Sequence, residues 1–453
     1  MFASQHKTCR LGRIFCIPGI VLLLAFPGSS TAENLFEIYQ LAEQSDPQYR
    51  EAEAVYRARL EARPQALAQL LPDVSLSANT TWNEQTISSA FVIGGSGSGD
   101  NFGFNNHGYS LSLTQPLFRW DRFLQYRQTD SIINQSNAEL LAAKQNLIIR
   151  VSESYFALLA AYDNLDFARA EKLALSRQLD QARQRFEVGL TAITDVQEAQ
   201  AGYDRAVASE IAAENNIDNT REVLREIIGV YLTDYSALLE AMPLLTPEPD
   251  DIDEWTTMAQ EQSLAVIAAM YAVDTAREEI KIRQAGHFPT LDLSGGAGYN
   301  KSGGRFGASK IHSDNIGLQL NVPLFKGGLV NSRTRESVEL LNQQLLRLEQ
   351  SRRTVQSDTR QAYLGVISGI SQVKAFKQAL VSSETALQAT EAGFEVGTRT
   401  AVDVVASQQT LLQARRDYAQ SRYNYVLDTL RLKRAAGMLS SDDLTAINQW
   451  FKK

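Results

Sequence analysis

Apolar residues recur every seven positions in two long parts of the chain. In the first part, residues 123–188, which contain neither proline nor glycine, this spacing links Leu141, Ile148, Tyr155 and Tyr162. In the second part, which begins near residue 329, it links Leu341, Leu348 and Val355. The spacing is typical of helices that pack as coiled coils. At a rise of 1.5 Å per residue, each helix would be about 100 Å long, which no ordinary globular domain needs.

Two pairs of alternating stretches precede these helices. In the first pair, apolar residues occupy every second position, at Val74, Leu76 and Ala78 and again at Tyr109, Leu111 and Leu113. The second pair falls at residues 291–294 and 316–322, and small polar residues fill most of the positions between. Such alternation is typical of strands with one apolar and one polar face. We therefore expect strand pairs at about 72–118 and about 289–325.

The predicted strands have features of strands that span a membrane. Four strands cannot close a barrel, and an open strand edge is not tolerated in lipid. If these strands cross a membrane, several chains must therefore share one barrel. Trp82, Tyr109 and Tyr299 stand where aromatic residues of a membrane interface could lie. The alternative is a soluble four-stranded sandwich, which leaves no place for the long helices.

The chain contains two copies of one unit. The motif FEVG at 186–189 returns at 394–397, and Asp195 and Val196 return as Asp403 and Val404, each 208 positions later. A duplication of this length predicts two equivalent structural repeats. We place the seam at the proline cluster Pro243, Pro247 and Pro249. The expected organisation is a first repeat at 33–245, with long helices at about 120–230, and a second at 246–453, with long helices at about 327–437 and a C-terminal segment.

The first 32 residues have the pattern of a signal peptide. Basic residues precede an apolar run at 14–26, and the small residues Ser30 and Ala32 stand at the −3 and −1 positions of a cut after Ala32. The alternative is a membrane anchor. The run is shorter than the roughly 20 residues that a spanning helix needs, and it contains Pro18 and Gly19. We therefore expect an exported protein.

The composition of the chain argues against several kinds of binding and catalytic site. With 52 acidic and 44 basic residues, the formal charge is −8, which argues against a nucleic-acid partner. Both cysteines, Cys9 and Cys16, lie in the predicted signal peptide, and the four histidines are scattered, so we expect no metal site. The glycine-rich run at 94–99 lacks the lysine and helix of a phosphate-binding loop. No catalytic set is recognisable, so we expect no enzyme, no catalytic residues and no cofactor.

Three motifs give the chain a resemblance to a known family. They are QRFEVGLTAITDVQ at 184–197, HFPTLDL at 287–293 and GTRTAVDV at 397–404. On these motifs, and on the matching duplication, the sequence resembles the TolC family of outer-membrane export channels from residue 33 to about residue 448.

The resemblance implies a mixed α/β membrane protein. Three copies of the chain would share a twelve-stranded outer-membrane β-barrel, four strands from each, continuous with a long α-helical periplasmic tunnel. An equatorial belt would contain residues 230–280 and 439–453. The implied function is the passive exit duct of a tripartite efflux pump or a type I secretion system. Its implied partners are a periplasmic adaptor, an inner-membrane transporter and outer-membrane lipid. Asp292 would face the pore.

The resemblance also implies a gate at the periplasmic tips of the helices. Thr194 and Asp195 match positions that bond to the position of Arg399, and Gln178 and Glu391 match a second link. Asp403 matches an aspartate whose threefold copies ring the aperture and select cations. Because three carboxylates round one axis repel each other, a bound cation would stabilise the ring.

Taken from the sequence alone, the tip residues have a plainer interpretation. Gly189 and Gly397 each follow a long helix, where glycine is favoured. Asp195 and Asp403 stand early in the next helix, where a carboxylate complements the helix dipole. The resemblance favours the gate, and it makes the tips at Gly189, Leu190 and Gly397 the expected contacts of the adaptor.

Two positions depart from the family pattern. Phe394 stands where a tyrosine hydroxyl usually bonds to the aspartate, and Ala406 stands where a second aperture aspartate is usual. We therefore expect one gate link fewer and one carboxylate ring instead of two. A periplasmic coiled-coil adaptor without a pore is the main alternative to a channel, and the two duplicated strand pairs count against it.

Overall fold

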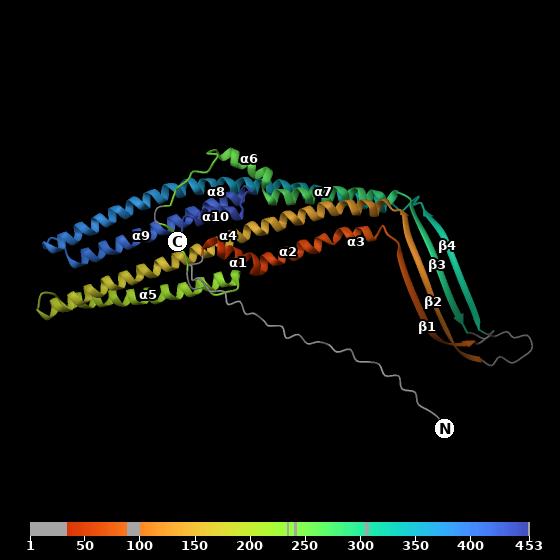
Figure 1. Ribbon diagram of the computed structural model, residues 1–453, viewed down its shortest axis with the longest axis horizontal. Coiled ribbons are helices and arrows are strands. Elements are labelled where there is room, and N and C mark those ends of the chain that lie inside the picture. The colour runs from red at the N-terminus through yellow and green to blue at the C-terminus, as the bar shows by residue number, and fades with distance from the viewer. Residues whose placement is uncertain (1–33, 88–99, 233–234, 240–241, 304–307, 452–453) are drawn as a thin grey trace, which may run out of the picture.

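The computed structural model describes residues 34–87, 100–232, 235–239, 242–303 and 308–451. The predicted signal peptide at 1–32 and the glycine-rich run at 94–99 lie outside these residues. The molecule is strongly elongated, with long helices side by side over most of its length (Figure 1). A sheet projects from one end, and two helical hairpins point to the other.

The same order of elements occurs twice along the chain. The first series is α1 (Leu35–Ser45), α2 (Pro47–Leu60), α3 (Ala62–Ala68), β1 (Asp73–Ile87), β2 (Asp100–Phe118), α4 (Trp120–Glu187) and α5 (Ile193–Ile228). The second series is α6 (Ile252–Gln262), α7 (Leu264–Gln284), the 3₁₀ turn η1 (Ala285–His287), β3 (Thr290–Ser302), β4 (Ser309–Asn321), α8 (Leu329–Glu395) and α9 (Ala401–Ala435). A short helix, α10 (Ser441–Asn448), follows.

The two long helices expected from the seven-residue spacing are confirmed. Helix α4 has 68 residues and α8 has 67. In α4 no proline removes a backbone hydrogen bond and no glycine weakens the helix. Each long helix turns back at its far end into the second arm of a hairpin, α5 or α9.

The repeats differ where the chain approaches the sheet. The first repeat uses two helices, α2 and α3, which meet at Glu61, whereas the second uses the single helix α7 of 21 residues. Pro64 explains the break, because it has no N–H to donate to the carbonyl of Leu60 and its ring clashes with that carbonyl. No proline occurs in α7.

The four expected strands form one antiparallel sheet in the order β1-β2-β3-β4. Strand β2 pairs with β3, with Tyr109 opposite Tyr299, and this pairing joins the two repeats. Among the described residues, β1 and β4 each pair on one side only. The sheet therefore ends in two free edges.

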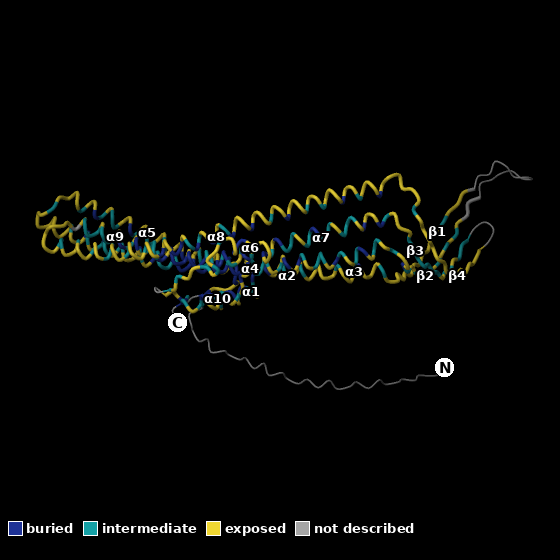
Figure 2. Tube along the Cα trace, turned by 90° about the horizontal axis from the view of Figure 1, so that it is seen from above, coloured by how far each residue is buried: buried dark blue, intermediate teal, exposed yellow. Residues whose placement is uncertain are grey.

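Most of the buried residues lie near the middle of the molecule (Figure 2). There α1 and α10 pack against the middle of α4 and α8 and the ends of α5 and α9. The Tyr155 hydroxyl donates to the Ser236 carbonyl at 2.7 Å, and burial raises the pKa of Tyr155. The Tyr425 hydroxyl donates to the Leu245 carbonyl at 2.9 Å and accepts from the Leu245 N–H at 2.8 Å. These bonds tie the connecting segment after α5 to the long helices.

The segment at 230–280 was expected in the equatorial belt. Its first part, with Leu238 and Trp255, packs in the central core, whereas its second part lies outside that core. Helix α7 leaves the central core, and its Val266 and Val273 form a separate cluster with Leu348 and Val355 of α8. In the described part of the chain, no helix combines the length and the apolar character needed to cross a membrane.

Candidate functional site

One face of the sheet is apolar and the other is small and polar. Because paired residues point to the same side, the register groups Val74, Leu113 and Ile316 with Leu76, Leu111 and Leu318 on one face. Leu76 is 73 % exposed and Ile316 80 % exposed in the single chain. An apolar face this exposed is normally buried against another apolar surface, and in the strands of a membrane barrel that surface is lipid.

The opposite face carries hydroxyls and glycines. The Ser75 and Ser112 hydroxyls are 2.7 Å apart, and so are those of Ser77 and Ser110. Across β3 this face continues with Ser294, Gly296 and Gly298. Small polar side chains leave room beside the sheet and bind water well, which suits the wall of an aqueous channel.

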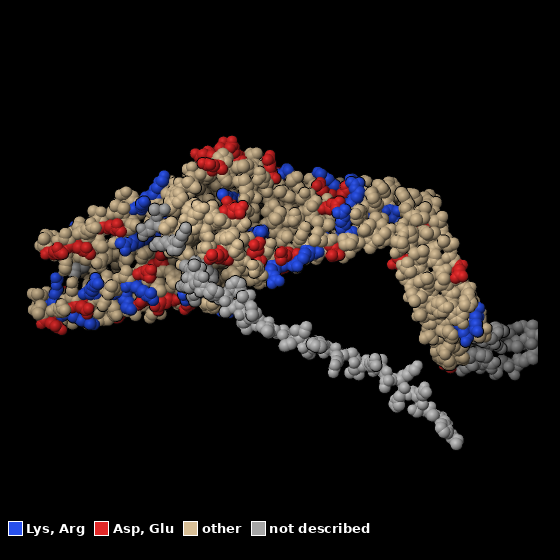
Figure 3. All heavy atoms as spheres, in the orientation of Figure 1, with Lys and Arg blue, Asp and Glu red and all other residues tan. Residues whose placement is uncertain are grey.

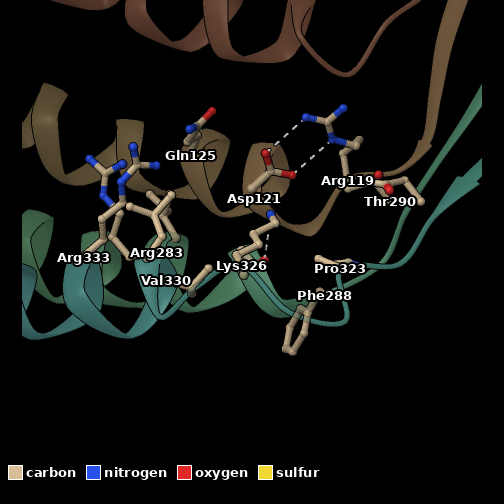
Figure 4. A pocket seen from close by; sticks show the side chains of 15 residues that line it. Arg119, Asp121, Gln125, Arg283, Phe288, Thr290, Pro323, Lys326, Val330 and Arg333 are labelled. Carbon is tan, nitrogen blue, oxygen red and sulfur yellow. Dashed lines mark hydrogen bonds and ion pairs between the residues drawn. The ribbon is translucent and has the colours of Figure 1, made fainter.

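A pocket of about 370 Å³ lies where the sheet meets the helices (Figure 4). Arg119 donates to both carboxylate oxygens of Asp121, at 3.3 and 3.4 Å, and lies 3.5 Å from Oδ2 of Asp292. Lys326 donates to the Gly286 carbonyl at 3.3 Å. The contact of Arg119 with Asp292 holds the start of α4 against β3. Asp292, expected to face the pore, lies on the polar face of the sheet.

The hairpin tips are tight turns with exposed apolar residues. Gly189 has φ 73° and Gly397 has φ 80°, a left-handed backbone that glycine adopts without strain. The N–H of Leu190 donates to the Arg185 carbonyl at 2.8 Å, which closes the first turn. Leu190 is 77 % exposed and Val396 76 %. Both tips therefore present apolar side chains to the outside.

Each of the two aspartates at the tips accepts hydrogen bonds from a threonine of its own hairpin. The side chain of Asp403 accepts from the backbone N–H and the hydroxyl of Thr400 at 2.8 and 2.9 Å, and the N–H of Asp403 donates to that hydroxyl at 3.2 Å. The hydrogen bonds from Thr400 hold the pKa of Asp403 below its usual range, and the nearby charge of Arg399 acts in the same direction. Asp195 accepts from the Thr191 hydroxyl. Asp403 therefore forms a capping box with Thr400 at the start of α9.

Within the described residues of one chain, no hydrogen bond or ion pair joins Arg399 to Thr194 or Asp195, nor Gln178 to Glu391. The N–H of Arg399 donates to the Gly393 carbonyl at 3.1 Å, within its own hairpin. The family implies that these links run between coiled coils, and the described residues of one chain form none of them. They stay predictions.

The structure adds one contact that the sequence analysis did not name. The guanidinium of Arg185, at the end of α4, lies over the ring of Phe394, at the end of α8. Phe394 also lines a groove of about 310 Å³ between the two hairpins, together with Gln178 and Val404. The two tips of one chain thus contact each other through a cation and an aromatic ring.

Comparisons with known proteins agree with this architecture. The family model of outer membrane efflux proteins matches residues 38–230 and 255–438. The outer membrane protein TolC of Escherichia coli strain K12 is 35 % identical over 444 residues, which cover 95 % of this chain and 87 % of that protein. The alkaline protease secretion protein AprF of Pseudomonas aeruginosa is 28 % identical and covers 94 % of this chain and 89 % of its own length.

Solved structures show the same fold. The CmeC outer membrane channel of Campylobacter jejuni superposes with a TM-score of 0.74 at 16 % identity, over 93 % of this chain and 90 % of that one. CusC superposes with a TM-score of 0.73 at 15 % identity, over 89 % and 92 %. Two repeats of strands and long helices, a polar sheet face and a family match over most of the length lead to one conclusion. The chain belongs to the family of outer membrane efflux proteins.

Proposed function

We propose that this protein is the exit duct of a tripartite efflux pump or a type I secretion system. It lies in the outer membrane, extends into the periplasm, and passively conducts small molecules or unfolded protein from an inner-membrane transporter to the outside. The observation that carries the proposal is the two-faced sheet, apolar on one side and lined with Ser75, Ser77 and Gly296 on the other. The family model of outer membrane efflux proteins supports the first route, and the relative AprF, named for alkaline protease secretion, supports the second.

The working unit would be a homotrimer. The free edges of β1 and β4 leave backbone groups unpaired, which lipid does not tolerate. Pairing β4 of one chain with β1 of the next satisfies both edges, and three chains close a barrel of twelve strands. The apolar face with Leu76 and Ile316 would then contact outer-membrane lipid.

A periplasmic adaptor would bind at the hairpin tips. The exposed side chains of Val188, Leu190 and Val396 surround the turns at Gly189 and Gly397. Apolar side chains at the end of a coiled coil can be buried by the matching tip of another helical hairpin. The alternative, that the chain is itself an adaptor without a pore, is not favoured by its relatives, which are outer-membrane channels.

The gate would close between neighbouring hairpins of the trimer. Arg399 of one hairpin would bond to Thr194 and Asp195 of another, and Gln178 would bond to Glu391. The Asp403 carboxylates would ring the aperture and favour cations. Phe394 has no hydroxyl to add a link and Ala406 adds no second ring, so the gate would depend mainly on Arg399.

The gate is tested by the variant Arg399→Ser. We expect a higher single-channel conductance in a planar bilayer, and greater entry of vancomycin into cells, because the main link of the closed state is lost. The control is Arg415→Ser on the same hairpin, whose exposed ion pair with Glu384 is 3.3 Å long. Equal conductance in wild type and Arg399→Ser would discard this gate assignment.

The duct itself is tested in a strain that lacks the gene. Cells without the protein should accumulate ethidium, and the full chain should restore its efflux. The protein should stay in the outer-membrane fraction after washing with urea. A protein that urea removes would instead support the adaptor alternative.

A further inference from the structure

The outward, apolar face of the sheet ends in a row of basic residues. In the sheet register His107 lies opposite Lys301, and Lys301 lies opposite Lys310. These three residues are on the same face as Leu111 and Ile316. They stand near the end of the sheet that is far from the helices, where basic side chains appear at the surface (Figure 3).

An aromatic row separates this basic row from the apolar band. The rings of Tyr109 and Tyr299 have centroids 5.5 Å apart, and those of Tyr299 and His312 are 4.9 Å apart. In membrane barrels, aromatic girdles mark the boundary between acyl chains and headgroups. The basic row is the next row beyond it, at headgroup level.

The position along the strand agrees with that boundary. From Leu320, at the helix end of β4, to Lys310 the strand would extend about 33 Å at about 3.3 Å per residue. A tilt near 40° reduces this to about 25 Å, the height of the apolar band of an outer-membrane barrel. Measured from Leu320, Lys310 therefore lies at about the height at which such an apolar band ends.

The two lysines have no anionic partner among the residues that the structure describes. Like charges directly opposite each other on neighbouring strands destabilise the pair. Neither Lys301 nor Lys310 has an ion pair within the described part of the chain. The carboxylates described on this face, Asp314 and Glu84, each lie two rows away in the register. An external anion would remove the repulsion.

We propose that Lys301 and Lys310, with His107, bind the phosphate group of a lipid in the distal leaflet of the membrane. Two ammonium groups can donate to the oxygens of one phosphate, and an imidazole N–H can add a third donor. The acyl chains of the same lipid would cover Tyr109 and the apolar band. This inference rests on the proposed function, because it needs this face of the sheet to lie in lipid.

The test measures lipid binding and thermal unfolding of the full trimer, with lipid A, a phosphorylated glycolipid, and with dephosphorylated lipid A. In native mass spectrometry, Lys301→Gln/Lys310→Gln should bind lipid A about tenfold to thirtyfold more weakly than wild type, as expected for the loss of two lysines at an anionic lipid surface. Lys301→Arg/Lys310→Arg should keep the binding. The control Lys374→Gln/Lys377→Gln, which removes the same charge from exposed positions of α8, should not change it.

The substitution should lower the unfolding temperature in lipid A but not in dephosphorylated lipid A. With lipid A, wild type should unfold at a higher temperature than Lys301→Gln/Lys310→Gln. With dephosphorylated lipid A, the variant should be as stable as wild type or more stable, because repulsion between the lysines is gone. Equal lipid A binding by wild type and variant would overturn the proposal. If the same samples still conduct ions, that result leaves the exit duct intact.

Discussion

The guanidinium of Arg185 lies 5.7 Å from the centroid of the Phe394 ring, and this contact joins the two hairpin tips of one chain. Exposed cation–π contacts contribute about 0.5–1 kcal/mol. We predict that Phe394→Leu loosens the closed state and increases the open fraction in single-channel recordings. The control is Phe186→Leu, which changes the equivalent residue of the first repeat. Equal effects of the two variants would show that the Arg185 contact is not specific.

The cap at Thr400 predicts a pH dependence. Hydrogen bonds from Thr400 lower the pKa of Asp403, so the capping interaction is fully present above the usual carboxylate pKa and is lost as pH falls through the lowered value. Thr400→Val removes the hydroxyl and should raise this pKa. Cation selectivity, measured from reversal potentials, should then disappear at a higher pH than in wild type.

Any repulsion among the three Asp403 carboxylates is present in both wild type and Thr400→Val. The difference between their selectivity profiles therefore reports the effect of the cap alone. Thr410→Val serves as the control, since the Thr410 hydroxyl donates to the Ala406 carbonyl, within the same helix. A selectivity profile that is identical in wild type and Thr400→Val would contradict the role of the cap.

Because the sheet has two different faces, we predict that adjacent positions of a strand differ in whether they tolerate an arginine. Ile316 lies on the apolar face and Asn315 on the polar face of β4. Arginine on the lipid face costs about 2–4 kcal/mol near the bilayer midplane, whereas changes on the lumen side alter selectivity. We expect Ile316→Arg to lower the yield of heat-resistant trimer in outer membranes, and Asn315→Arg to assemble and reduce cation selectivity. The reverse pattern would mean that the faces are exchanged.

A buried ion pair holds α2 against α4. Arg150 donates to both carboxylate oxygens of Asp46, at 3.1 and 2.6 Å, and Asp46 also accepts from the N–H of Tyr49 at 2.7 Å. Asp46→Ala should lower the free energy of unfolding by about 3 kcal/mol, at the low end for a buried pair, because 31 % of the Arg150 side chain is exposed.

Chemical denaturation in detergent measures this loss. Glu53→Ala, which breaks an exposed pair with Arg57, is the control and should cost less than about 1 kcal/mol. A loss as small for Asp46→Ala as for Glu53→Ala would show that the buried pair does not stabilise the fold.

The long helices and strands follow from local patterns in the sequence. The seven-residue spacing through Leu141 and Leu341 and the alternation at Val74 each act over neighbouring residues, and both predicted their elements correctly. The break between α2 and α3 also had a local signal, Pro64. The cap at Asp403 was visible as a threonine three positions earlier.

The contacts between hairpins could not be predicted in the same way. Arg185 and Phe394 meet because α4 and α8 lie in neighbouring hairpins, and nothing near either residue specifies the other. The partners expected for Arg399 lie on the other hairpin, as the family resemblance implied, and the described residues of one chain show no bond to them. Local pattern thus predicts the elements, whereas the proposed gate would depend on packing between them.

A channel is tested most directly by the ion conductance of the purified full-length protein in a planar bilayer, with trimer formation verified by cross-linking. We predict a small, cation-selective conductance, because the polar face of each sheet would line the pore of the shared barrel. A verified, membrane-inserted trimer that conducts no ions, in wild type and in Arg399→Ser alike, would contradict it.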